Sequence, residues 1–241
     1  MTNHKSIKAT VLGTAAAASF LLSGAASAEV TANVSALSNY IFRGTTYSGD
    51  SAVVQGGIDW GHDSGIYAGT WASTLGDAGL GGGEVDFYAG FAGEAGALGY
   101  DLGVLTYQYT SFPNTNYTEA YVSGTYGVIT VGLNYTIDAG SANKDKAFDE
   151  GDIYFFGSAD FTAGAVDISL YAGRYDYTND GKYGNGDISY NHVGASISKD
   201  GFSFAIDKSD VEPTNSAVGG LSPNMDAVRF TVGYGLDFDL M

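Results

Sequence analysis

Apolar and polar residues alternate along the chain up to its last residues. One face of residues 230–240 carries threonine, glycine and aspartate. The other face carries Phe230, Val232, Tyr234, Leu236, Phe238 and Leu240. Successive side chains of a β-strand point to opposite faces, so this pattern predicts a strand between an apolar and an aqueous environment. It is typical of the wall of a membrane barrel.

The same two-residue period recurs along the chain and predicts twelve strands. They cover residues 30–44, 51–60, 65–74, 84–93, 99–109, 117–125, 128–138, 152–162, 165–177, 187–198, 202–210 and 227–240. Every odd-numbered gap between them is longer than every even-numbered gap. Bacterial outer-membrane barrels have this rhythm, because their periplasmic turns are short and their external loops are long. We therefore expect an all-β, up-and-down antiparallel transmembrane barrel of about 12 strands, with 10 as the alternative.

Aromatic residues fall near the ends of the predicted strands. By alternation they face outward, with Trp60, Phe202 and Phe238 near the periplasmic end and Phe42 and Phe230 near the external end. Membrane barrels carry aromatic girdles at both interfaces, so these positions support the same fold.

The first residues predict an exported protein. Lys5 and Lys8 precede an apolar stretch from Val11 to Leu22, and Ala26-Ser27-Ala28 follows it. A basic region, a short apolar run and an A-x-A site are typical of a secretory signal peptide, and the run is shorter than the roughly 20 residues of a spanning helix. We expect residues 1–28 to be a signal peptide cleaved after Ala28 and residues 29–241 to form one barrel domain. An uncleaved anchor is the less favoured alternative.

Composition agrees with an exported strand protein. The chain has 36 glycines, 18 tyrosines, 13 phenylalanines, three prolines and no cysteine, so it is rich in strand and turn formers and forms no disulfides. Removing residues 1–28 leaves 213 residues, with eight basic against 27 acidic side chains and a net charge of −19. This charge argues against nucleic acid as a partner. An acidic lumen would favour cations, although a solvated acidic exterior is the commoner explanation of such a charge.

Several stretches of the first half resemble a known family. They are residues 38–44 (SNYIFRG), 54–60 (VQGGIDW), 64–69 (SGIYAG), 84–90 (EVDFYAG) and 116–119 (NYTE). In this order they resemble the TorF family of candidate porins, and beyond Thr136 only strand pattern and spacing agree. The resemblance implies a proteobacterial outer-membrane barrel that acts as a pore and is inserted by the barrel-assembly machinery. It names no solute.

The chain departs from the usual outer-membrane pattern at its last residue. Such chains usually end in phenylalanine, whereas this one ends in Met241. Residues 231–238 look like the same assembly signal displaced three residues inward, so the departure concerns insertion efficiency and not the fold.

Five charged residues are predicted to point into the lumen. Arg43 on the first strand and Arg229 on the last would be neighbours in a closed barrel and form a basic strip. Glu84, Asp86 and Glu119 would face them across the external half of the lumen. Such a transverse field sorts solutes by charge in other pores. The alternative is that the same residues form a salt-bridged plug, because side chains can largely fill a lumen of this size.

The sequence offers little chemistry for catalysis or for a metal. His62 lies in a predicted periplasmic turn, and His192 faces inward with no suitably placed serine beside it. The spacing from Asp176 to Asp187 approaches a calcium loop but has Thr178 at position 3 and no preceding helix. We therefore expect no enzyme activity, no cofactor and no metal site.

Two kinds of function follow from these observations. The first is a passive or mildly charge-selective porin for small hydrophilic solutes, with Arg43, Arg229, Glu84, Asp86 and Glu119 lining the pore. The second is a closed structural or adhesive barrel whose external loops contact lipopolysaccharide. Both place the chain in the bacterial outer membrane, in contact with its lipid, and the sequence does not indicate an oligomeric state.

Overall fold

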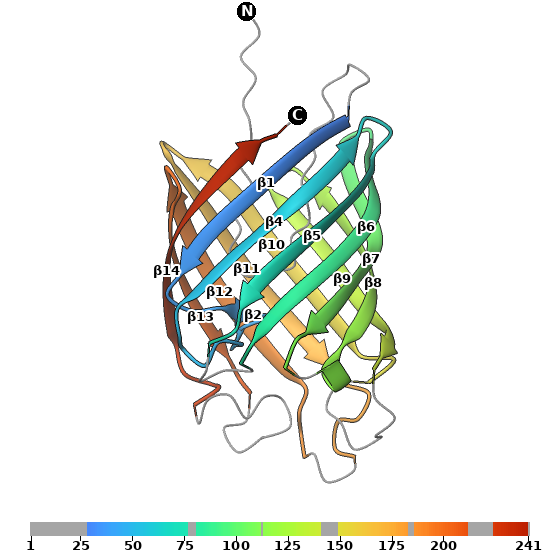
Figure 1. Ribbon diagram of the computed structural model, residues 1–241, viewed down its shortest axis with the longest axis vertical. Helices are drawn as coiled ribbons and strands as arrows, with labels where there is room; N and C mark the ends of the chain where they lie inside the picture. Colours follow the sequence, from blue (N-terminus) through green and yellow to red (C-terminus); the bar gives the residue numbers. More distant parts are fainter. Residues whose placement is uncertain are drawn as a thin grey trace, which may run out of the picture.

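A closed barrel of twelve antiparallel strands makes up the protein (Figure 1). The computed structural model describes residues 28–76, 81–111, 113–140, 149–182, 186–211 and 224–240. The barrel strands are β1 (Ala28–Leu37), β4 (Val53–His62), β5 (Ile66–Thr74), β6 (Gly83–Ala95), β7 (Leu98–Tyr109), β8 (Tyr117–Tyr126), β9 (Ile129–Ala139), β10 (Ile153–Ala163), β11 (Val166–Asp176), β12 (Tyr190–Lys199), β13 (Phe202–Ser209) and β14 (Arg229–Asp239). The predicted fold and strand number are confirmed.

The first and last strands close the barrel. β1 pairs with β14 in antiparallel register, with Val34 opposite Leu236 and Ala36 opposite Tyr234. The other edge of β1 pairs with β4. A closed ring of strands leaves no edge with unpaired backbone groups, which is the condition for a sheet in an apolar solvent.

The connections at the two ends of the barrel differ in length. Short turns lie at the end where β1 begins and β14 ends, and long connections lie at the opposite end (Figure 1). We call these the short-turn end and the long-loop end. The short turns use left-handed residues such as Gly127 (φ 63°) and the pair Asp200 and Gly201 (φ 51° and 83°). The predicted alternation of short and long connections is confirmed.

The outer surface of the barrel is apolar. Outward residues such as Ile58, Phe87 and Val131 are half exposed on their strands. Trp60, Phe202, Phe230 and Phe238 are exposed as well, as expected of girdle residues. A continuous apolar exterior of this extent is typical of a surface that faces lipid.

The described residues contain little helix. The 3-10 turn η1 (Pro113–Thr115) precedes β8. Within these residues, no helix has the length and hydrophobicity needed to cross a membrane.

The segment after β1 corrects the predicted strand 30–44. β1 ends at Leu37, and residues 38–52, here called the inner loop, turn into the lumen. Within the inner loop, β2 (Ile41–Phe42) and β3 (Thr45–Thr46) form a small hairpin. Phe42 is therefore buried inside the barrel and is not part of a girdle.

Local hydrogen bonds explain why the chain leaves the wall at this point. The side-chain oxygen of Asn39 accepts hydrogen bonds from Thr46 Oγ1 at 2.7 Å and Ser48 Oγ at 2.9 Å, and its Nδ2 donates to Asp50 Oδ1 at 2.8 Å. The hairpin tip has Arg43 at φ 49° and Gly44 at φ 81°, as in the turns that favour two-residue hairpins. The inner loop is thus a folded unit.

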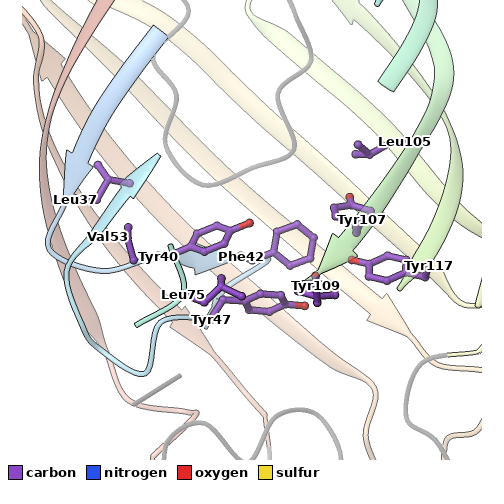
Figure 2. Packing of buried hydrophobic residues seen from close by; sticks show 10 residues of the cluster. All are labelled: Leu37, Tyr40, Phe42, Tyr47, Val53, Leu75, Leu105, Tyr107, Tyr109 and Tyr117. Atoms are coloured by element: carbon purple, nitrogen blue, oxygen red, sulfur yellow. The ribbon is translucent and has the colours of Figure 1, made fainter. Parts of the chain in front are cut away.

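Aromatic side chains fill the lumen toward the long-loop end. Figure 2 shows Tyr40 and Phe42 of the inner loop between Leu37 and Val53 on one wall and Tyr107 and Tyr109 on another. A second buried cluster lies on β10, β11, β12 and the following loops, with Tyr154, Tyr175, Tyr177, Ile188, Tyr190, Val211 and Met225 as members. The main core of this barrel is therefore inside its lumen.

Candidate functional site in the barrel lumen

The tip of the inner loop is bound to the barrel wall by a buried ion pair. Arg43 Nη1 and Nη2 donate to Glu119 Oε1 and Oε2 at 2.8 and 2.6 Å. Arg43 is 2% exposed and Glu119 is fully buried. Two parallel bonds between a guanidinium and a carboxylate form the strongest kind of ionic hydrogen bond in proteins.

Both partners are satisfied by further neighbours. Glu119 Oε2 also accepts hydrogen bonds from the Tyr107 hydroxyl at 3.1 Å and Asn134 Nδ2 at 2.9 Å. The Arg43 guanidinium lies 4.2 Å from the ring centre of Tyr154 and 5.0 Å from that of Tyr175. Hydrogen bonds and aromatic faces thus replace the water that both charges would otherwise require.

A bulge in β9 lies beside Glu119. The register between β8 and β9 shifts between Thr118, opposite Asp138, and Glu119, opposite Thr136. Bulges bend a strand locally and redirect its side chains, and they are frequent near functional sites. Because the extra residue, Ile137, is on β9, the alternation of β8 is kept, and Glu119 is buried in the lumen as predicted.

Arg229 has a different set of partners, so the predicted basic strip does not form. Its Nε donates to Asp50 Oδ1 at 2.8 Å. Its Nη1 donates to the Met225 carbonyl oxygen at 3.0 Å, and its Nη2 donates to the Asn224 carbonyl oxygen at 2.9 Å. Arg43 is on the hairpin tip and not on β1, because the chain leaves the wall at Leu37. Each arginine instead fixes one part of the inner loop to the barrel.

Glu84 and Asp86 lie on β6 and are buried in the lumen. Glu84 Oε1 is 3.5 Å from the Tyr40 hydroxyl and 3.4 Å from the Tyr109 hydroxyl. Glu84 Oε2 and Asp86 Oδ1 have no hydrogen-bond partner among the described residues. No salt bridge within the described residues involves either side chain.

Tyrosine–aspartate pairs line other parts of the lumen. The Tyr67 hydroxyl donates to Asp101 Oδ1 at 2.5 Å, and the Tyr171 hydroxyl donates to Asp207 Oδ1 at 2.7 Å. Asp59 accepts a hydrogen bond from Tyr88 in the same way, so it belongs to the lumen wall. Each carboxylate thus receives a hydroxyl donor from another strand.

Inward glycines make room for these tyrosine rings. A Cβ on Gly90 would lie 2.4 Å from the Tyr67 hydroxyl oxygen, and one on Gly194 would lie 2.2 Å from the Tyr171 ring. In the sequence, this packing of tyrosine rings over glycines is visible only as inward glycines and inward tyrosines on neighbouring strands. The overall glycine and tyrosine content does not reveal it. The many glycines and tyrosines therefore serve the lumen as well as the turns.

Within the described residues, neither His62 nor His192 is part of a serine triad: Ser209 lies opposite His192 on β13, and its Oγ donates to the Met225 carbonyl oxygen at 2.9 Å. His192 Nε2 and the Tyr154 hydroxyl are hydrogen bonded at 2.7 Å. His62 Nδ1 is 2.9 Å from Ser64 Oγ and accepts the Ser64 N–H at 3.1 Å, as expected of a turn residue. The arrangement of His192 is that of a buried residue which supports the wall.

The predicted calcium-like loop is held by its own backbone. Asp180 Oδ1 accepts the N–H of Ile188 at 2.5 Å and of Ser189 at 3.1 Å, and these bonds lower the pKa of the Asp180 carboxyl. Across the described ranges, no three His, Cys, Asp or Glu side chains gather as a metal centre.

A small cavity separates the inner loop from the opposite wall. Asn39 and Gly44 line it on one side, and Tyr171, His192 and Asp207 line it on the other. Its volume is about 20 Å³, which is room for about one water molecule. The inner loop therefore sits closely against this wall.

Comparison with known proteins shows the family and supports the barrel fold. A family model described as "Bacterial protein of unknown function (Gcw_chp)" matches residues 22–232. The KdgM porin is 10% identical, with a TM-score of 0.54 over 88% of this chain and 99% of that one. The NanC porin is also 10% identical, with a TM-score of 0.52 over 88% of this chain and all of that one. At this identity the likeness establishes the fold. No curated protein matches the chain.

Proposed function

We propose that this chain, which belongs to the Gcw_chp family of bacterial proteins of unknown function, is an outer-membrane channel for small hydrophilic solutes. The observation that carries the proposal is the inversion of polarity across the wall. The outside is apolar, whereas the inside carries Arg43, Glu84 and Glu119 among hydroxyl groups. A polar lumen within an apolar wall is the arrangement of a membrane pore.

The proposal also includes the assignment to TorF-type porins and the orientation of the barrel in the outer membrane. The long-loop end would face the outside of the cell and the short-turn end the periplasm, as in other up-and-down barrels. Lipid and lipopolysaccharide would surround the apolar exterior, and the barrel-assembly machinery would insert the chain. Residues 1–27, most of the predicted signal peptide, lie outside the described residues, as does Met241.

The channel would exist in a closed and an open state. In the described arrangement the inner loop and the aromatic clusters occupy the lumen toward the long-loop end, where Tyr40, Arg43 and Glu119 are all buried. Passage of a solute therefore requires the inner loop to leave its seat. The Arg43–Glu119 ion pair is the contact that would have to break, so it would act as the latch.

Charge selectivity would depend on the same residues once the lumen is open. Of the five predicted residues two are basic and three are acidic, and Asp59, Asp101 and Asp207 add further carboxylates to the lumen wall. We expect a mild preference for cations. Asp86→Asn and Glu119→Gln should shift the reversal potential toward anions, and unchanged selectivity in the double variant would remove these carboxylates from the pore.

A closed structural or adhesive barrel is the second candidate. The specific observation in its favour is the occupied lumen, since Arg43 and Glu119 satisfy one another without water. In this case the long loops would contact lipopolysaccharide or a surface partner and no solute would pass. The two candidates differ in a single property, which is permeability.

Liposome swelling separates the two candidates. The full barrel is folded into liposomes, and swelling is followed in a series of neutral, acidic and basic solutes of increasing size. Heat-modifiable migration on a denaturing gel shows that the barrel is folded. Swelling by small solutes that is faster for Arg43→Met than for the wild type supports the channel. Absence of swelling with both folded proteins would leave the closed barrel.

A further inference from the structure

Two neighbouring inward carboxylates on β6 form no salt bridge with any described residue. Glu84 and Asp86 are two residues apart, so both point into the lumen, and Glu84 is completely buried. The nearest candidates for compensation are engaged elsewhere, Arg43 with Glu119 and Arg229 with Asp50. A buried ionised carboxylate without a partner is strongly unfavourable, so this pair either holds a proton or is balanced by a bound cation.

The same region has a surplus of hydrogen-bond acceptors. Glu84 Oε2 and Asp86 Oδ1 are buried and have no hydrogen-bond partner in the part of the chain that the structure describes, and the same holds for Gln55 Oε1 on β4. Gln55 pairs with Ser73, and Ser73 pairs with Glu84, so the three residues form one row across β4, β5 and β6. The small Ser73 side chain lies between the two longer ones.

The orientation of the Gln55 amide follows from its hydrogen bonds. Ser73 Oγ donates its proton to the Thr74 carbonyl oxygen at 2.8 Å. The same Oγ must therefore accept from Gln55, whose Nε2 lies 3.2 Å away. The unpartnered atom of the amide is thus its oxygen, which adds a neutral acceptor to the two carboxylates.

We propose that Glu84, Asp86 and Gln55 bind one hard divalent cation of the calcium type inside the barrel. Carboxylate and amide oxygens are the ligands that calcium prefers, and its variable coordination accepts water for the remaining positions. A charge of +2 balances the two carboxylates. The site has only two acidic side chains, and its third ligand is a neutral amide. A search for clusters of acidic residues therefore does not reveal it.

Phenol groups complete the surroundings of the site. The hydroxyls of Tyr40 and Tyr109 lie at 3.5 and 3.4 Å from Glu84 Oε1, which is long for a hydrogen bond between oxygens. Glu84 therefore retains its capacity to bind an ion. Tyr40 belongs to the inner loop, so a cation at Glu84 would also support the seat of that loop. The proposal does not depend on conduction, since a permanently closed barrel would bind the ion equally well.

Terbium luminescence and calcium-dependent unfolding test the site. The full barrel is folded in detergent, stripped of metal with a chelator and titrated with Tb³⁺, whose luminescence is excited through nearby aromatic rings. The Tyr40 hydroxyl lies 3.5 Å from Glu84 Oε1, and the Trp71 ring centre lies 5.5 Å from that of Tyr40. We expect luminescence that calcium displaces and an unfolding temperature that rises with calcium. The isosteric double variant Glu84→Gln/Asp86→Asn should lose both responses, and Glu150→Gln, an exposed loop carboxylate, should keep them.

Two results would overturn the proposal. The first is an equal calcium response in the wild type and the double variant, which would place the ion elsewhere. The second is no response to Tb³⁺ or calcium in the wild type, together with an infrared band of protonated carboxyl groups at neutral pH that the double variant lacks. Protons would then neutralise the pair. Gln55→Leu, which keeps both carboxylates, serves as the test variant if the double variant does not fold, and it should weaken calcium binding.

Discussion

Arg43 and Glu119 lie 76 positions apart in the chain and meet inside the lumen, where Arg43 Nη2 is 2.6 Å from Glu119 Oε2. Arg43 comes from the tip of the inner loop and Glu119 from the barrel wall on β8. The pair joins the element that fills the lumen to the wall that surrounds it. In the proposed channel, the energy of this contact sets the balance between the closed and the open state.

Breaking one side of this ion pair should be more harmful than removing both charges. Arg43→Met leaves a buried carboxylate, and Glu119→Leu leaves a buried guanidinium, at a cost of about 3–5 kcal/mol each. The double variant Arg43→Met/Glu119→Leu leaves no unpaired charge at this position. Its loss in free energy of unfolding should be clearly smaller than the sum of the losses in the two single variants. Urea unfolding of the refolded barrels measures this coupling. Strictly additive effects would show that the two side chains do not interact.

The hairpin tip should not tolerate a side chain at Gly44. Gly44 has φ 81°, and a Cβ there would lie 2.2 Å from His192 Cβ. Gly44→Ala should therefore push the inner loop from its seat and speed hydrogen exchange of the inner-loop amides. Gly127→Ala is the matched control, since Gly127 has φ 63° and nothing within 4 Å of the added Cβ. Equal exchange in both variants would contradict the close packing of the tip against β12.

The glycines beneath the tyrosine rings should matter for stability. In Gly90→Ala the new Cβ would lie 2.4 Å from the Tyr67 hydroxyl and disturb its bond to Asp101, at a cost of about 1–3 kcal/mol. In Gly99→Ala the nearest atom, Thr125 Cβ, is 3.7 Å away, so this control should remain close to the wild type. Urea midpoints of the two variants test the difference. A Gly90→Ala barrel as stable as the control would remove the packing role of Gly90.

Asp152, in the connection before β10, should make stability depend on pH. Its carboxylate accepts the N–H of Thr178 at 2.7 Å and of Asp149 at 2.8 Å, and burial nevertheless raises the pKa of Asp152 to about 6. The folded state then binds more protons than the unfolded state, in which an aspartate has a pKa of about 3.9. The contribution of Asp152 to the free energy of unfolding is therefore largest below about pH 4 and falls as the pH rises to about 6.

The Asp152→Asn variant should lose this part of the pH dependence. Urea unfolding at several pH values, with the wild type in parallel, measures the loss. The same slope in both proteins would show that Asp152 does not titrate in this range.

The barrel could be predicted because its determinants are local. The two-residue period of segments such as 129–138 and 230–240 reports directly which face meets the apolar environment, and the turn residues separate the strands. The inner loop could not be predicted in the same way. The alternation of β1 continues past Leu37 through Tyr40 and Phe42, and the hydrogen bonds of Asn39 that override it are visible only in three dimensions.

The sequence predicts which wall residues of the candidate site face the lumen. It does not predict which charged side chains form ion pairs there. Glu84, Asp86 and Glu119 face inward as alternation predicts, because they lie on regular strands. Alternation predicts Arg43 on the first strand beside Arg229, and both predictions are wrong because the chain turns inward after Leu37. Gln55 carried no recognisable signal, since an inward amide is ordinary until its neighbours are known. The pore-lining role of these residues remains a prediction.

Single-channel recording with a shortened inner loop tests the central claim most directly. Residues 39–51 are replaced by a short glycine-serine linker between Ser38 and Ala52, and the folded barrel is inserted into planar bilayers beside the wild type. If the inner loop closes the channel, we expect stable ohmic steps from the shortened barrel and rarer or smaller steps from the wild type. Repeated silence from a shortened barrel that is folded by gel migration would contradict a channel closed by its inner loop.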